Sequence, residues 1–202
     1  MVVYVVAGYL ASRTDTVSIK LERGFSTEIR ILRLVPQDLR MELAFRGDHS
    51  KRPELGDWIN ANSDGALVFA RPGAAILLTA SAPGAAPVTF EALPKSSHGV
   101  DRVGRNLTSD LSIRPGVWRW PPSSGRARII LHAGVTPVTL SIAKVDAALA
   151  GEAVELLIHP PLGFKSGDAN VSWLWFWFLW PIMVVVQMLW AAVLIVMARR
   201  RW

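Results

Sequence analysis

The C-terminal segment of this chain constrains its fold more than any other feature. No charged residue occurs over positions 173–198, and Arg199, Arg200 and Arg201 follow directly. A helix of that length extends about 39 Å, whereas crossing a hydrocarbon core about 30 Å thick requires roughly 20 apolar residues. The pattern predicts a transmembrane helix over 173–198. The arginines predict that the basic tail, 199–202, is cytoplasmic, because positive charge is retained on that side.

The first half of the predicted span is rich in aromatic residues and the second half is aliphatic. Tryptophan rings settle at the depth of the lipid headgroups, so we expect the first turns to lie at the outer interface. The predicted interface anchors are Trp173, Trp175, Trp177 and Trp180. Pro181 follows them and removes one backbone donor, which favours a kink there.

Gln187 places an amide near the middle of the predicted span. An amide is costly in hydrocarbon unless it finds a hydrogen-bond partner. Met183 and Ala191 stand four residues to either side, and therefore on the same helix face. A small residue beside a polar one is typical of helix–helix contacts in membranes. We expect a partner helix on this face; the alternative is a glutamine that bonds to its own backbone.

Residues 1–12 are apolar but too few to span a bilayer, and they lack the charged start of a standard signal peptide. Three interpretations stand. The segment is the outer part of a first membrane helix that begins upstream, a short helix partly sunk in the membrane, or a buried β-strand rich in valine. The first interpretation would also explain how the following domain is exported.

Residues 13–159 have the pattern of short strands separated by turns. The clearest alternation covers 38–46, where Leu39, Met41, Leu43 and Phe45 share one face and charged residues occupy the other. This period of two predicts a strand with one buried face. Further strands are predicted at 17–22, 88–90, 127–131, 138–142 and 154–158.

The breaks between these segments are rich in Gly, Pro, Asn, Asp and Ser. Such spacing predicts a mainly β domain, an antiparallel β-sandwich of Ig-like or jelly-roll-like type. Single helical turns are predicted within 50–60 and 143–153, the second starting near Asp146. Residues 160–172 are predicted to link the domain to the membrane.

Composition excludes several classes of function. The chain has no cysteine, so it has neither a disulfide framework nor thiolate chemistry. Its net charge is +6, of which the three terminal arginines supply +3 and all other residues the remaining +3. No basic run precedes them, which argues against a nucleic-acid partner.

Candidate chemical sites are few and incomplete. The histidines His49, His98, His132 and His159 are far apart, so a metal site is not expected. A Ser96-Ser97-His98 run with Asp101 is too close in sequence for triad geometry. The polar run 60–65 begins like a calcium loop but lacks its acidic first and last ligands.

Trp118 and Trp120 flank one residue of a predicted strand, so both indoles face the same side. Core packing is the first interpretation, and a surface that stacks sugars or meets a partner is the second.

Taken together, the sequence predicts a non-enzymatic accessory subunit of a bacterial inner-membrane complex, without catalytic residues, metal or cofactor. The bulk of the chain would be periplasmic, and its partners would be the bilayer and a larger integral membrane protein. The Ala-, Arg-, Gly- and Pro-rich composition favours a bacterial source. The alternative is a membrane-anchored periplasmic module that binds or senses a glycan or lipid.

Overall fold

The computed structural model describes residues 9–57, 60–61, 67–69, 71–95, 97–98, 101–109, 116–118, 127–160 and 176–199. The chain forms two compact units. The first consists of Thr14–His159, and the second combines Met1–Arg13 with Pro160–Trp202.

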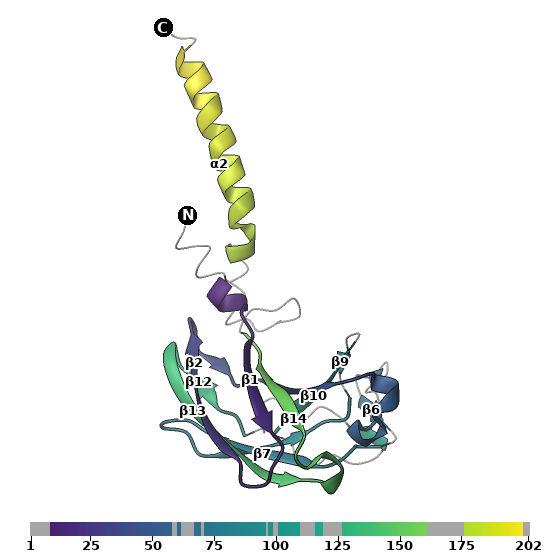
Figure 1. Ribbon diagram of the computed structural model, residues 1–202. Coiled ribbons are helices and arrows are strands. Elements are labelled where there is room, and N and C mark those ends of the chain that lie inside the picture. The colour runs from purple at the N-terminus through teal and green to yellow at the C-terminus, as the bar shows by residue number, and fades with distance from the viewer. Residues whose placement is uncertain are drawn as a thin grey trace. The chain divides into compact units, whose positions relative to one another are not determined.

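The first unit, called the β unit below, is built almost entirely from strands (Figure 1). They are β1 Asp15–Lys20, β2 Ser26–Arg33, β3 Gln37–Asp38, β4 Met41–Arg46, β5 Asn60–Ala61, β6 Leu67–Phe69, β7 Ile76–Ser81, β8 Val88–Ala92, β9 Ser97–His98, β10 Arg102–Thr108, β11 Gly116–Trp118, β12 Ile130–Leu131, β13 Gly134–Val145 and β14 Ala153–Ile158. The short 3-10 helices are η1 His49–Lys51, η2 Pro53–Leu55 and η4 Ala147–Leu149.

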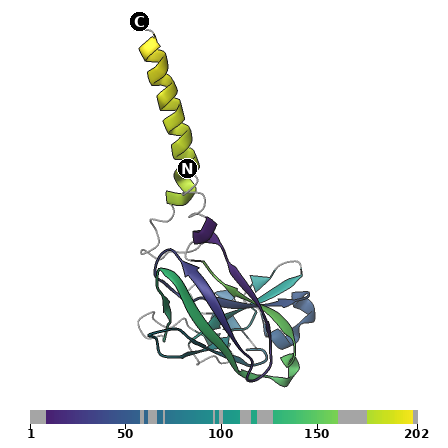
Figure 2. The same cartoon turned by 60° about the vertical axis from the view of Figure 1, so that its left-hand side comes forward.

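Nine strands form one antiparallel sheet in the order β1-β14-β4-β10-β8-β7-β13-β2, with β9 also paired to β10. Small sheets of β11-β6-β5 and of β12-β3 accompany it. Figures 1 and 2 show that the large sheet curls into a nearly closed, barrel-like form. The mainly β prediction is confirmed. The sandwich type is not confirmed, because the strands follow one continuous hydrogen-bonded order.

The two ends of this sheet, β1 and β2, are consecutive in the chain. A short turn joins them, in which the Phe25 N–H donates to the Glu22 carbonyl. At the opposite ends of the strands, the Arg33 guanidinium donates to the Asp15 carboxylate at 3.0 Å. The edge strands are thus tied at both ends, by a turn and by an ion pair.

Alternating apolar residues explain most of the strands. The predicted segments 17–22, 88–90, 138–142 and 154–158 overlap β1, β8, β13 and β14, whose inward residues supply much of the core. The predicted strand 127–131 is shorter in the structure and survives only as β12. The strands β2 and β10 were not predicted.

The strand predicted over 38–46 is wrong in two respects. The chain leaves the ladder at Leu39 and Arg40, so the segment splits into β3 and β4. Glu42, expected on a solvent face, is 8% exposed. It is buried because β4 lies between β14 and β10, and because its carboxylate pairs with the His159 imidazole at 3.1 Å.

The helical turn predicted within 50–60 appears as η1 and η2, and the one predicted within 143–153 appears as η4. The Asp146 carboxylate accepts a hydrogen bond from the Ala148 N–H and so caps η4.

Arg105 of β10 is the largest fully buried side chain described. Its guanidinium donates to the carbonyls of Pro72, Ala74, Ala92 and Leu93, at 2.7–3.2 Å. Burial lowers the pKa of Arg105 to about 10, so it remains a cation at neutral pH. The side chain therefore ties the segment before β7 to the end of β8.

The segment before β7 also crosses the end of η2 at very short range. Gly56 and Gly73 both adopt positive φ, and a Cβ on Gly73 would lie 2.6 Å from the Leu55 carbonyl carbon. Only glycine fits such an approach between two backbones. Arg52, which precedes η2, forms ion pairs with Glu54 and Glu152 and stacks over Phe45.

In the second unit, α2 extends over Phe176–Arg199 and contains Pro181. Its stretch Pro181–Arg199 is long and apolar enough to cross a membrane, and none of it is buried. Residues 9–12 are helical, which rules out a strand there. Residues 1–8 lie outside the described residues, so a second membrane helix is not confirmed.

Candidate functional site

The candidate site is a cavity at the point where β4 and β10 separate. Their pairing ends at Asn106, which lies opposite Glu42. From there β10 continues beside β8, where Leu107 lies opposite Ala92. In the other direction β4 continues beside β14, where Met41 lies opposite Ile158. The two strands separate here, and the cavity lies between residues 38–41 and residues 106–109.

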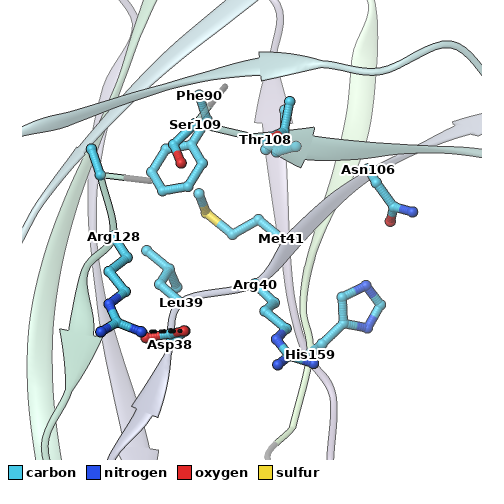
Figure 3. Close-up of a pocket in the computed structure, with 12 residues that line it drawn as sticks. Asp38, Leu39, Arg40, Met41, Phe90, Asn106, Thr108, Ser109, Arg128 and His159 are labelled. Carbon is cyan, nitrogen blue, oxygen red and sulfur yellow. Dashed lines mark ion pairs between the residues drawn. The ribbon is translucent and has the colours of Figure 1, made fainter. Parts of the chain in front are cut away.

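The cavity measures about 490 Å³, within the range of small-molecule pockets. Residues 38–41 form one wall and residues 106–109 form the opposite wall. The remaining lining residues are Phe90, Ala127, Arg128 and His159. Figure 3 shows the lining residues.

The floor of the cavity is apolar. Leu39, Met41 and Phe90 are at most 5% exposed and belong to the core. In Figure 3 the Met41 side chain extends toward the Phe90 ring. An apolar ligand group that reached this floor would exchange water for thioether and aromatic contacts, which favours its binding.

The rim carries the charges. Asp38 and Arg128 form an ion pair at 3.6 Å, and the Arg128 side chain is 56% exposed. Arg40 is exposed, and among the described residues its side chain takes part in no ion pair or hydrogen bond. Arg40, Arg128 and Asp38 together contribute a net charge of +1 to this rim.

His159 follows β14 and lines the cavity, and it is held through its backbone and its side chain. The backbone N–H of His159 donates to the Arg40 carbonyl at 3.0 Å. Its own carbonyl accepts from Gln37 at 3.0 Å and from Arg33 at 3.3 Å. These bonds fix the wall that carries Arg40, so the rim is positioned by the fold.

The structure places the predicted partner-helix residues Met183, Gln187 and Ala191 on α2, all exposed. Arg199 is the last residue of this helix. Trp177 and Trp180 lie on α2 and Trp118 on β11, but their side chains lie outside the described residues. Trp173, Trp175, Trp120, Arg200 and Arg201 lie wholly outside them.

Within the part of the chain that the structure describes, no predicted site residue lines the cavity, whereas the histidine His159 does. Among the described residues no three acidic or histidine side chains cluster to hold a metal ion. Ser97 and His98 form β9, and Asn60 and Ala61 form β5; the rest of the run 60–65 lies outside the description.

Sequence reasoning missed the cavity because its walls come from strands distant in the chain. No local signal marks it, because Arg40 is an exposed residue between buried Leu39 and Met41 and so continues the alternation of a strand.

No protein-family model matches this chain. No curated protein matches it either. A solved crystal structure of a protein from Sulfurospirillum deleyianum is similar, with 13% sequence identity and a TM-score of 0.48. The match covers 74% of this chain and 98% of that one.

Proposed function

We propose that this chain is a non-enzymatic accessory subunit of a bacterial inner-membrane complex. In this proposal α2 crosses the membrane with its basic end in the cytoplasm, and the β unit stands in the periplasm. The bilayer and a larger integral membrane protein are its partners.

The exposed amide of Gln187 supports the proposal. It lies within the apolar stretch of α2, and among the described residues it has no hydrogen-bond partner. Met183 and Ala191 are exposed on the same face. A helix of a partner subunit would satisfy the amide and pack closely against Ala191.

Two substitutions test this face. Gln187→Leu removes the amide, and Ala191→Leu adds bulk where close packing is proposed. Ala192→Leu is the matched control, because residue 192 points about 100° away from residue 191 around the helix. Full-length protein is extracted in mild detergent, and the partner that co-purifies is quantified for each variant.

We expect both face variants to lose most of the partner while Ala192→Leu retains it. Interhelical hydrogen bonds in membranes contribute about 1 kcal/mol, which corresponds to roughly fivefold weaker association. If the face variants retain as much partner as the control, this face is not the contact.

A second function is favoured by the cavity between β4 and β10. In this alternative the β unit binds or senses a small ligand, and α2 keeps it at the membrane. Met41 lies on the cavity floor, so an entering ligand would change its surroundings. A Met41 methyl resonance that responds to no ligand class would contradict this function.

A further inference from the structure

We propose that the cavity between β4 and β10 binds an amphiphile that has one apolar chain and an anionic head, a carboxylate or a phosphate. This inference rests on the second proposed function, and it selects a lipid-like ligand over a glycan.

The floor selects for an apolar group. Leu39, Met41 and Phe90 present aliphatic, thioether and aromatic surface, and their side chains offer no donor and no acceptor other than the weak Met41 sulfur. The hydroxyl groups of a sugar would lose their water against such a surface without replacement, which is costly. A hydrocarbon chain meets no such cost and gains by burial.

The polar wall offers little to a glycan. Asn106 and Thr108 line the β10 side, but both already take part in interactions within the protein. A glycan would need several free donors and acceptors to fix its hydroxyls. Ser109 is the third polar residue of this wall.

The rim selects for an anion. Arg128 is partly neutralised by Asp38, whereas Arg40 pairs with no described residue. Arginine presents donors in a planar fork that matches the oxygens of a carboxylate or phosphate. The geometry therefore places the anionic head at Arg40 and the chain on the floor beside Met41.

Methionine methyl resonances test the inference in the full-length protein. The chain has five methionines: Met1, Met41, Met183, Met188 and Met197. Met41 alone lies in the β unit, whereas Met183, Met188 and Met197 belong to α2. In ¹³C-methyl-labelled protein in phosphatidylcholine nanodiscs, Met41 reports the cavity and the α2 methionines report partitioning into the bilayer. Met41→Leu assigns the signal.

The probes are octanoate, octyl phosphate and octyl glucoside, which share a chain length and differ in the head. We expect saturable shifts of the Met41 signal with octanoate or octyl phosphate, and the tighter of the two identifies the head. Octyl glucoside should bind at least about tenfold more weakly. Arg40→Gln should weaken the anionic probes by at least about tenfold, since a charge-assisted bond is lost. Arg30→Gln, at an exposed arginine of β2 outside the cavity, should not.

A second variant tests whether the probes bind inside the cavity, without a change of charge. Ala127 is an exposed residue that lines the cavity, so Ala127→Trp should block all three probes. Ala86→Trp, at an exposed alanine outside the cavity, should leave binding unchanged.

The outcomes distinguish the proposed anionic amphiphile from the proposed function on which it rests, ligand binding by the β unit. Equal affinity for octyl glucoside and the anions, or full binding by Arg40→Gln, overturns the anionic ligand but leaves a ligand-binding cavity. A Met41 signal that no probe shifts, while the α2 signals respond, overturns both.

Discussion

Replacing Arg105 by methionine should destabilise the β unit severely, although it removes a buried charge. Methionine keeps the unbranched stem but loses the guanidinium, and the carbonyls of Pro72, Ala74, Ala92 and Leu93 lose their donor. No substitution of Arg105 can remove these acceptors, because they belong to the backbone. The usual compensation, replacing both partners by apolar groups, is therefore not available here.

Two magnitudes decide whether Arg105→Met lowers or raises the free energy of unfolding. Bonds to a charged donor contribute about 1.5–3 kcal/mol each, so four of them amount to roughly 6–12 kcal/mol. Burial opposes this, since it lowers the pKa of Arg105 from its ordinary value to about 10, a shift that corresponds to roughly 3 kcal/mol. The expected loss is about 3 kcal/mol or more, a large share of a typical domain stability of 5–15 kcal/mol.

The assay is hydrogen exchange of the full-length protein in detergent, read by mass spectrometry on peptides from β7, β8 and β10. The slowest amides give the free energy of global opening of the β unit. Arg102→Met is the matched control, because Arg102 lies on the same strand, is exposed and, among the described residues, pairs with Glu155 alone. Its loss should stay under about 1 kcal/mol. If Arg105→Met costs no more than Arg102→Met, the buried guanidinium does not tie β7 and β8 together.

Two further predictions concern the η2 region. Gly73→Ala should lower the stability of the β unit by more than 2 kcal/mol, because it combines backbone strain with a 2.6 Å contact. Gly84 also has positive φ but lies in open space, so Gly84→Ala should cost about 1 kcal/mol. Equal shifts of the melting temperature for the two variants would refute the close approach at Gly73. Burial, the largest single effect, raises the pKa of Glu54. The hydrogen bonds from Arg52 and from the Glu54 backbone, together with the charges of Arg52 and Lys95, outweigh burial and hold this pKa below its ordinary value. The ionised Glu54 therefore stabilises the fold above about pH 4.5, and this contribution disappears as the pH falls through the lowered pKa. Arg52→Gln should flatten the plot of melting temperature against pH in this range. An unchanged plot would show that the Arg52–Glu54 ion pair does not stabilise the fold.

Strands could be predicted from the sequence where their own residues alternate between apolar and polar. In β1, β8 and β14 the buried residues are apolar and alternate with more exposed residues, which are polar or small except for Leu157, so the period of two locates these strands. The strand β10 escaped prediction because it contains Gly104, Arg105 and Asn106, which have low β propensity or are charged. Arg105 is buried only because distant carbonyls surround it.

The candidate site was beyond prediction for a related reason. The cavity forms because the pairing of β4 with β10 ends at Asn106, whereas β4 remains paired to β14. Such pairings depend on the register between segments that are distant in the chain. Glu42 illustrates the same limit. Its alternation suggested a solvent face, but a neighbouring strand and His159 bury it.

Site-specific crosslinking tests the central proposal, a larger partner on the Gln187 face of α2, most directly. The chain has no cysteine, so Met183→Cys introduces a single thiol on this face, takes a photoreactive maleimide in native membranes and leaves the Gln187 amide in place. Val185→Cys, on the opposite side of the helix from Met183, is the control. The account predicts an adduct with a larger membrane protein from position 183 and little from 185. Equal adducts from both positions, or adducts only between copies of this chain, would contradict it.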